Sequence, residues 1–274
     1  MVGCGVKASL FIFSIAMLIV RSGNSENKPD FSYTAPEKDP LNSAVEWSKL
    51  QDRNGDAYLP NTEKPYSGWA KQTYDNGKVK VLAEFTDGSV THLKQWQDNG
   101  IPKSDVEYLK GKVSLSAVPL KDSWKNFSLH HGLVTYWYKN GQKSSERSYK
   151  YGKFDGILTK WYENGQKMFV INCKDGKKEG LEIFYDENGQ KYSEGNYKEG
   201  KEDGLHSSWY KKGQKRLEEN YKDGKLMSVE VWKPNGEKCP VTNVKEGNGV
   251  QVWYREDGTE FARFTYKDGE KVKD

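Results

Sequence analysis

Few side chains in this sequence have the types and spacing that catalysis or metal binding requires. Of the four histidines, only His130 and His131 are neighbours. Neighbours on a strand point to opposite faces, so one metal ion rarely binds both. Asp186-x-Asn188-Gly resembles the start of a calcium loop, but Lys191 follows and the later bidentate glutamate is missing. The patterns H-E-x-x-H, C-x-x-C and G-x-S-x-G do not occur. We therefore expect no catalytic residue, metal ligand or bound cofactor; a hydrolase that uses His130 or His131 is the weakest alternative.

Lysines form the most regular charged feature. Lys143 and its counterparts at steps of 24 residues would line one turn edge, and two further lysines per step, such as Lys150 and Lys153, would line the other. Such rows could bind acidic lipid or another polyanion. Asp175, Glu179 and similar acids interleave the second row, which favours a solvated edge that resists strand-to-strand aggregation. Nucleic acid is not an expected partner, because a net charge of +4 over 274 residues releases few counterions.

Aromatic pairs are the strongest candidates for binding. Trp137 is followed by Tyr138, and similar pairs recur along the chain. Because neighbours on a strand face opposite sides, we expect a Trp/Phe row on one face and a Tyr row on the other. One row would shield the sheet, and one would stay partly open to a protein partner or to sugar rings. The candidate partner-binding residues are Trp137, Tyr138, Trp161, Tyr162, Phe184, Tyr185, Trp209, Tyr210, Trp253 and Tyr254.

These residues belong to a repeated unit. Glycines recur every 24 residues, for example at Gly132, Gly156, Gly180 and Gly204. The unit reads G-x-x-x-x-W-Y-x-N-G-Q-K, then about five residues, then Y-K-x-G-K-x-x-G. Asn-Gly is a strong hairpin signal because both residues tolerate positive φ. The aromatic and alternating segments around it favour strands, so each unit predicts two strands and two turns.

The predicted fold is all-β: an elongated, single-layer antiparallel sheet, a meander of about eight β-hairpin repeats of ~24 residues each. The composition is compatible with a thin core, since 13% of the residues are aromatic and only 35% are hydrophobic. The 27 glycines would then be mainly hairpin corners.

The unit resembles the variant MORN repeat (membrane occupation and recognition nexus) over about residues 66–270, apart from an insertion at 112–131. The arrangement is also similar to the bacterial YwqK-type antitoxins of toxin–antitoxin systems. The resemblance implies a β-hairpin repeat module that binds partners and has no catalytic apparatus.

The remaining segments give the domain organisation. In residues 1–22, Lys7 precedes a short apolar run and small polar residues follow, which is typical of a secretory signal peptide. An uncleaved membrane anchor is the alternative. Removing these residues lowers the net charge from +4 to +2. We expect a disordered linker at 23–43, a leading β-hairpin at 44–65, degenerate repeats at 66–111, four regular repeats at 132–225 and two degenerate repeats at 226–274.

Export would place the mature chain in an oxidising compartment with two cysteines, Cys173 and Cys239. They lie nearly three repeats apart, roughly 25 Å at two strands per repeat. A disulfide needs Cα atoms within about 7 Å. We therefore expect two free thiols and a monomeric chain.

The leading hypothesis for function is a non-catalytic, exported scaffold that binds another protein in the cell envelope, antitoxin-like by resemblance. The alternative is a module that binds cell-wall glycan or acidic lipid. The sequence does not identify the partner.

Overall fold

The computed structural model describes residues 40–109 and 130–272. The chain divides into two units, Met1–Glu37 and Lys38–Asp274, and all described residues lie in the second. The expected signal peptide at 1–22, most of the linker and most of the 112–131 insertion lie outside the described residues. Within the described ranges, no helix is both long and apolar enough to cross a membrane.

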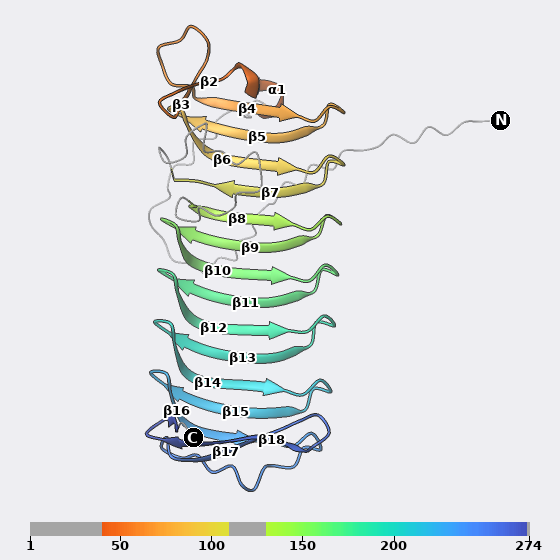
Figure 1. Cartoon of the computed structure of the whole chain (residues 1–274), viewed down its shortest axis with the longest axis vertical. Coiled ribbons are helices and arrows are strands. Elements are labelled where there is room, and N and C mark those ends of the chain that lie inside the picture. Colours follow the sequence, from red (N-terminus) through yellow and green to blue (C-terminus); the bar gives the residue numbers. More distant parts are fainter. Residues whose placement is uncertain (1–39, 110–129, 273–274) are drawn as a thin grey trace, which may run out of the picture. The chain divides into compact units, whose positions relative to one another are not determined.

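Fourteen strands of the second unit form one sheet in which neighbours in the chain are neighbours in space (Figure 1). All pairs in it are antiparallel except β1 with β4, which is parallel. The predicted all-β meander of consecutive hairpins is therefore confirmed. The strands of this sheet are β1 (Val45–Glu46), β4 (Gly68–Thr73), β5 (Val79–Thr86), β6 (Ser89–Trp96), β7 (Pro102–Glu107), β8 (Gly132–Trp137), β9 (Lys143–Lys150), β10 (Lys153–Trp161), β11 (Lys167–Lys174), β12 (Lys177–Tyr185), β13 (Lys191–Lys198), β14 (Lys201–Trp209), β15 (Lys215–Lys222) and β16 (Lys225–Val231).

Two kinds of turn alternate along the sheet. In the turn between β11 and β12, Asp175 and Gly176 both have positive φ, 50° and 85°, as a two-residue hairpin turn requires. In the Asn-Gly turns of the regular units only the glycine has positive φ, so the asparagine's tolerance of positive φ is not used there. Asn164 instead accepts a hydrogen bond from the amide of Gln166 at 3.0 Å and donates one to the carbonyl of Glu187 at 2.7 Å. The asparagine therefore links its own turn to the turn of the next unit.

The first strands of the sheet carry a second layer. This layer contains α1 (Pro40–Ser43), the 3₁₀ turn Trp47–Lys49, and a small hairpin of β2 (Gln51–Arg53) and β3 (Asp56–Tyr58). Ala57 of the hairpin is fully buried and packs against the buried side chains of β4, β5 and β6. Burial of apolar surface at this end therefore does not depend on the single sheet alone.

The last strands also carry a second layer. β17 (Gly249–Tyr254), β18 (Glu260–Lys267) and β19 (Glu270–Lys271) form a separate three-stranded sheet and do not extend the main one. The outer edge of β16 is occupied by other bonds: Leu226 donates to Gly269, Gly247 donates to Met227 and Cys239 donates to Val231. Because these hydrogen bonds use the backbone groups at the outer edge of β16, this strand does not pair with β17. The last hairpin packs over the face of the sheet instead.

Candidate binding surface

The pairing register sorts the side chains of the regular units onto two faces. Gly132 pairs with Tyr149 and Leu133 pairs with Ser148, so alternate pairs lie on opposite sides. We call the side that carries Val134, Tyr149 and the two end layers the capped face. We call the side that carries Leu133 and its counterparts the open face.

A column of aliphatic side chains runs along the open face. Its members occupy the position that follows the first glycine of each unit, and all four are exposed. Each stands opposite a small polar residue of the next strand, as Ile157 stands opposite Asn172. The sequence prediction missed this column because it rested on the aromatic residues, although the G-[LI] pair recurs at 24-residue steps. The exposed fractions are 45% for Leu133, 58% for Ile157, 43% for Leu181 and 45% for Leu205.

The tryptophans of the open face stand beside lysines. Trp161 ends β10 and pairs with Lys167, and Trp209 ends β14 and pairs with Lys215. The ammonium of Lys191 lies 4.4 Å from the ring centroid of Trp209, a cation–π contact. Trp137, Trp161 and Trp209 are only half-exposed. The predicted Trp row exists, but lysine side chains lie between its rings.

The third unit corrects the predicted rows. Tyr185 pairs with Lys191 as Trp161 pairs with Lys167, so Tyr185 and not Phe184 is the counterpart of the tryptophans. Phe184 lies one position earlier, on the capped face, where it contacts Phe169 at a centroid distance of 5.9 Å. The error arose because the doublet Phe184–Tyr185 looks like Trp-Tyr but is shifted by one residue relative to the glycines.

The tyrosines that follow the strand ends form a hydrogen-bonded ladder. Tyr138 donates its hydroxyl to the carbonyl of Trp161 at 2.6 Å, and Tyr162 donates to the carbonyl of Tyr185 at 2.9 Å. Tyr210, which is buried, makes the equivalent bond to Trp232 at 2.8 Å. Burial raises the pKa of Tyr138 and Tyr162, which keeps each hydroxyl protonated as a donor. Each of these hydroxyls therefore donates a hydrogen bond to the neighbouring unit.

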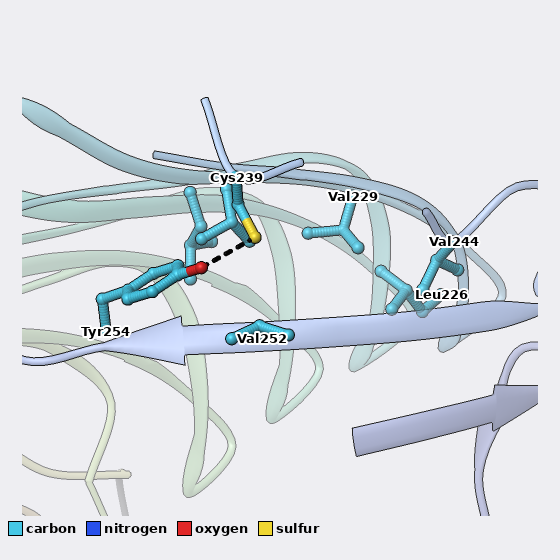
Figure 2. Close-up of a cluster of buried hydrophobic side chains, with 8 residues drawn as sticks. Leu226, Val229, Cys239, Val244, Val252 and Tyr254 are labelled. Atoms are coloured by element: carbon cyan, nitrogen blue, oxygen red, sulfur yellow. Dashed lines mark hydrogen bonds between the residues drawn. The ribbon is translucent and has the colours of Figure 1, made fainter. Parts of the chain in front are cut away.

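The last aromatic pair lies in the C-terminal sheet. Trp253 contacts the ring of Phe264 edge-on at 5.3 Å, and Tyr254 is buried in the core between the two sheets (Figure 2). The hydroxyl of Tyr254 lies 3.1 Å from the thiol sulfur of Cys239. That hydrogen bond raises the pKa of Tyr254 to about 12. Tyr254 therefore serves packing rather than an exposed surface.

Both cysteines in the described ranges are unpaired and buried. Cys173 occupies the slot of Tyr149 and Tyr197 on the capped face, as the repeat alignment requires. For Cys239, burial alone would raise the thiol pKa, but hydrogen bonds from Thr242 and Tyr254 hold it below its ordinary value.

The adjacent histidines His130 and His131 lie in different surroundings. His130 is buried between the rings of Tyr108 and Tyr149, and burial lowers its pKa to about 4. His131 lies beside Tyr151 and faces the amide of that turn residue at 3.4 Å. Over residues 40–109 and 130–272, no group of three or more His, Cys, Asp and Glu side chains could hold a metal ion.

Carboxylates gather at a hollow of about 290 Å³ on the capped face, near the C-terminal sheet. Glu219 is largely buried there; it accepts hydrogen bonds from Gln251 at 2.7 Å and from the hydroxyl of Tyr221 at 3.2 Å. Burial raises the pKa of Glu219. His206 lies with its Nδ1 3.7 Å from the carboxylate of Glu202. The repeat pattern gave no sign of this cluster, because these positions change type from unit to unit: Glu219 stands where the earlier units carry Arg147, Ile171 and Gly195.

Comparison with known proteins agrees with this geometry. A family model described as the MORN repeat variant matches residues 131–151, 178–199 and 202–223. The chain thus contains MORN-type repeats. Each matched segment spans most of one unit of the sheet, and such repeats generally serve as binding scaffolds. No curated protein matches the chain.

Proposed function

We propose that this chain is a non-catalytic, exported scaffold whose open face binds a partner protein. The MORN-type repeats and the pattern of residues 1–22 support the class of function and the export. The observation that carries the choice of surface is the aliphatic column, in which Leu133, Ile157, Leu181 and Leu205 are each 43–58% exposed. Aligned apolar side chains on a rigid surface are typical of protein interfaces.

The neighbours of the column suit it to protein recognition. Neutral polar side chains such as Ser148 and Asn172 alternate with the aliphatic ones across the strands. Lys191 and Glu194 pair with each other at 2.8 Å on the same face, so the surface offers little unbalanced charge. Successive units are about 9.6 Å apart at two strands each, so a partner that covers the column must contact several units. Neutralisation of a toxin, as the YwqK-type resemblance implies, would be one form of such binding.

A crosslinking experiment in the chain's own cells tests the proposal. Ile157→Lys places a charge at the most exposed position of the column and should abolish capture of a specific protein. Tyr151→Lys is the matched control, because Tyr151 is 68% exposed but lies on a turn outside the column. A protein captured by the wild type and by Tyr151→Lys, but not by Ile157→Lys, supports the proposal. Equal capture by both variants, or no specific capture by the wild type, refutes it.

The alternative function, binding of glycan or acidic lipid, has one observation in its favour. Asp155, Glu179 and Asp203 on the second turn edge accept hydrogen bonds from turn amides, at 3.2, 2.8 and 3.1 Å respectively. Lysines of that edge such as Lys174 and Lys198 are exposed. Sedimentation with cell-wall polysaccharide or with anionic vesicles tests this function, and retention that falls with salt would support it.

A further inference from the structure

The turns of this chain are rich in a pair of residues that can react with each other. In an Asn-Gly pair the backbone amide of the glycine can attack the side chain of the asparagine, because glycine has no Cβ to obstruct the approach. All of these pairs lie within the described ranges, and each asparagine is exposed, so access to water does not distinguish them. The asparagines are Asn54, Asn76, Asn99, Asn140, Asn164, Asn188, Asn235 and Asn248.

Most of these asparagines are held by a hydrogen bond to the side-chain oxygen Oδ1. In the second unit, Oδ1 of Asn164 accepts from the amide of Gln166 at 3.0 Å, and Nδ2 donates to the carbonyl of Glu187 at 2.7 Å. The side chain must give up these partners before its Cγ can reach the amide nitrogen of the following glycine. Oδ1 also accepts an amide hydrogen bond in Asn76, Asn99, Asn140, Asn235 and Asn248.

Asn188 of the third unit is an exception, and its neighbour Asp186 is the reason. Asp186 occupies the position of Tyr162 in the second unit. One of its carboxylate oxygens accepts hydrogen bonds from the amides of Asn188 and Gln190, at 3.0 and 2.9 Å. The amide that would hold the asparagine therefore already has an acceptor. In the part of the chain that the structure describes, no hydrogen bond reaches the side chain of Asn188.

Asn54, in the small hairpin of β2 and β3, is the second exception. The amide of its glycine donates to the carboxylate of Asp52 at 2.8 Å. The glycine that follows Asn188 donates only to the neutral backbone carbonyl of Asp186, at 2.9 Å. Hydrogen bonds to charged groups are the stronger ones, and the attacking nitrogen must give up this bond. Asn54 should therefore react more slowly than Asn188.

We propose that Asn188 is a site of spontaneous deamidation. The amide nitrogen of Gly189 forms a bond to Cγ of Asn188, and its proton passes through solvent to the side-chain nitrogen. The bond from Cγ to that nitrogen breaks, and ammonia leaves. Water then adds to either carbonyl of the resulting succinimide ring, so the products are aspartate and isoaspartate. No step needs an oxidant or a reductant.

Either product changes the turn between β12 and β13. It adds a negative charge close to Asp186 and Glu187, and isoaspartate also inserts a methylene group into the main chain of the turn. The site lies on a turn edge rather than in the aliphatic column, so it does not depend on the proposed function.

The chain contains its own matched control, because Asn164 and Asn188 both lie in the sequence E-N-G-Q-K. Incubation of the folded full chain in mildly alkaline buffer, followed by tryptic peptide mapping with mass spectrometry, gives a rate for each. Every ordinary hydrogen bond that must open first slows the reaction about fivefold. Asn188 should therefore react about thirtyfold faster than Asn164, whose side chain is held by two such bonds. In the urea-denatured chain the two rates should be equal.

Two variants test the cause. Asp186→Tyr gives the third unit the residue of the second, which frees the amide of Gln190 and should slow the reaction of Asn188 about fivefold. Asp186→Ala frees the same amide without adding a ring, and should have the same effect if the first variant does not fold. Glu194→Gln is the control and should leave the rate unchanged, because Glu194 pairs with Lys191.

Three results would overturn the inference. The first is an equal rate at Asn164 and Asn188 in the folded chain. The second is a folded Asp186 variant in which Asn188 reacts as fast as in the wild type. The third is aspartate as the sole product, since direct hydrolysis of the side chain gives no isoaspartate.

Discussion

The hydroxyl ladder of the strand-end tyrosines gives the sharpest test of how neighbouring repeats stabilise each other. Tyr162 donates its hydroxyl to the carbonyl of Tyr185 at 2.9 Å, across the boundary between two units. Tyr162→Phe removes this hydrogen bond and keeps the ring. In a repeat array, stability is approximately a sum of terms within units and between nearest neighbours. The substitution should therefore remove part of one interface term.

The expected loss in the free energy of unfolding is about 1 kcal/mol, the net value of a typical intramolecular hydrogen bond. For a folded unit of this size, that loss should lower the thermal midpoint by about 3 °C. Successive ladder tyrosines are separated by two or four strands, about 9.6 Å or more, which is far enough for their effects to add. Replacing all four ladder tyrosines by phenylalanine should then cost about 4 kcal/mol. The four are Tyr74, Tyr138, Tyr162 and Tyr210.

Urea unfolding followed by tryptophan fluorescence measures these losses. Tyr151→Phe is the matched control, because Tyr151 is 68% exposed. The control should leave the midpoint unchanged. If Tyr162→Phe costs no more than Tyr151→Phe, the ladder hydroxyls contribute nothing and the reasoning fails.

Glu219→Gln should change the pH dependence of stability. Burial raises the pKa of Glu219 in the folded chain. The contribution of this carboxyl group to stability is therefore complete below its unfolded pKa and is lost as the pH rises through its folded pKa. Urea unfolding from acid to neutral pH should show a flatter dependence of the free energy of unfolding on pH in the variant, and a dependence identical to that of the wild type would contradict this. Gly200→Ala should lower the free energy of unfolding by about 1 kcal/mol through backbone strain alone. Gly200 has a φ of +85°, and a Cβ there would meet Lys177 at an ordinary contact distance of 3.6 Å. Gly200→Asn should lower the free energy of unfolding by less in the same assay. A chain without residues 1–22 should show two thiols, Cys173 and Cys239, that react slowly when native and fully when denatured without reductant; finding none would indicate a disulfide.

The strand order of the main sheet could be predicted from the sequence because each hairpin is closed by residues close together in the chain. Turns such as Asp175-Gly176 reverse the direction of the chain locally, and equivalent turns recur every 24 residues. The candidate site was predicted less well, since the doublet Phe184–Tyr185 was placed one position out of register. A shift of one residue moves a side chain to the other face, so only the pairing register could place these rings.

The sequence by itself determined the all-β class, the hairpin meander and the free cysteines, because all three follow from local turns and from distance along the array. Only the tertiary structure decided how the ends are covered. The packing of Ala57 on the first strands and of Val252 on the last ones joins residues far apart in the chain, and no repeat pattern specifies such contacts. The tertiary structure also decided the surroundings of Glu219, because its hydrogen bond from Gln251 comes from a sheet that lies outside the meander.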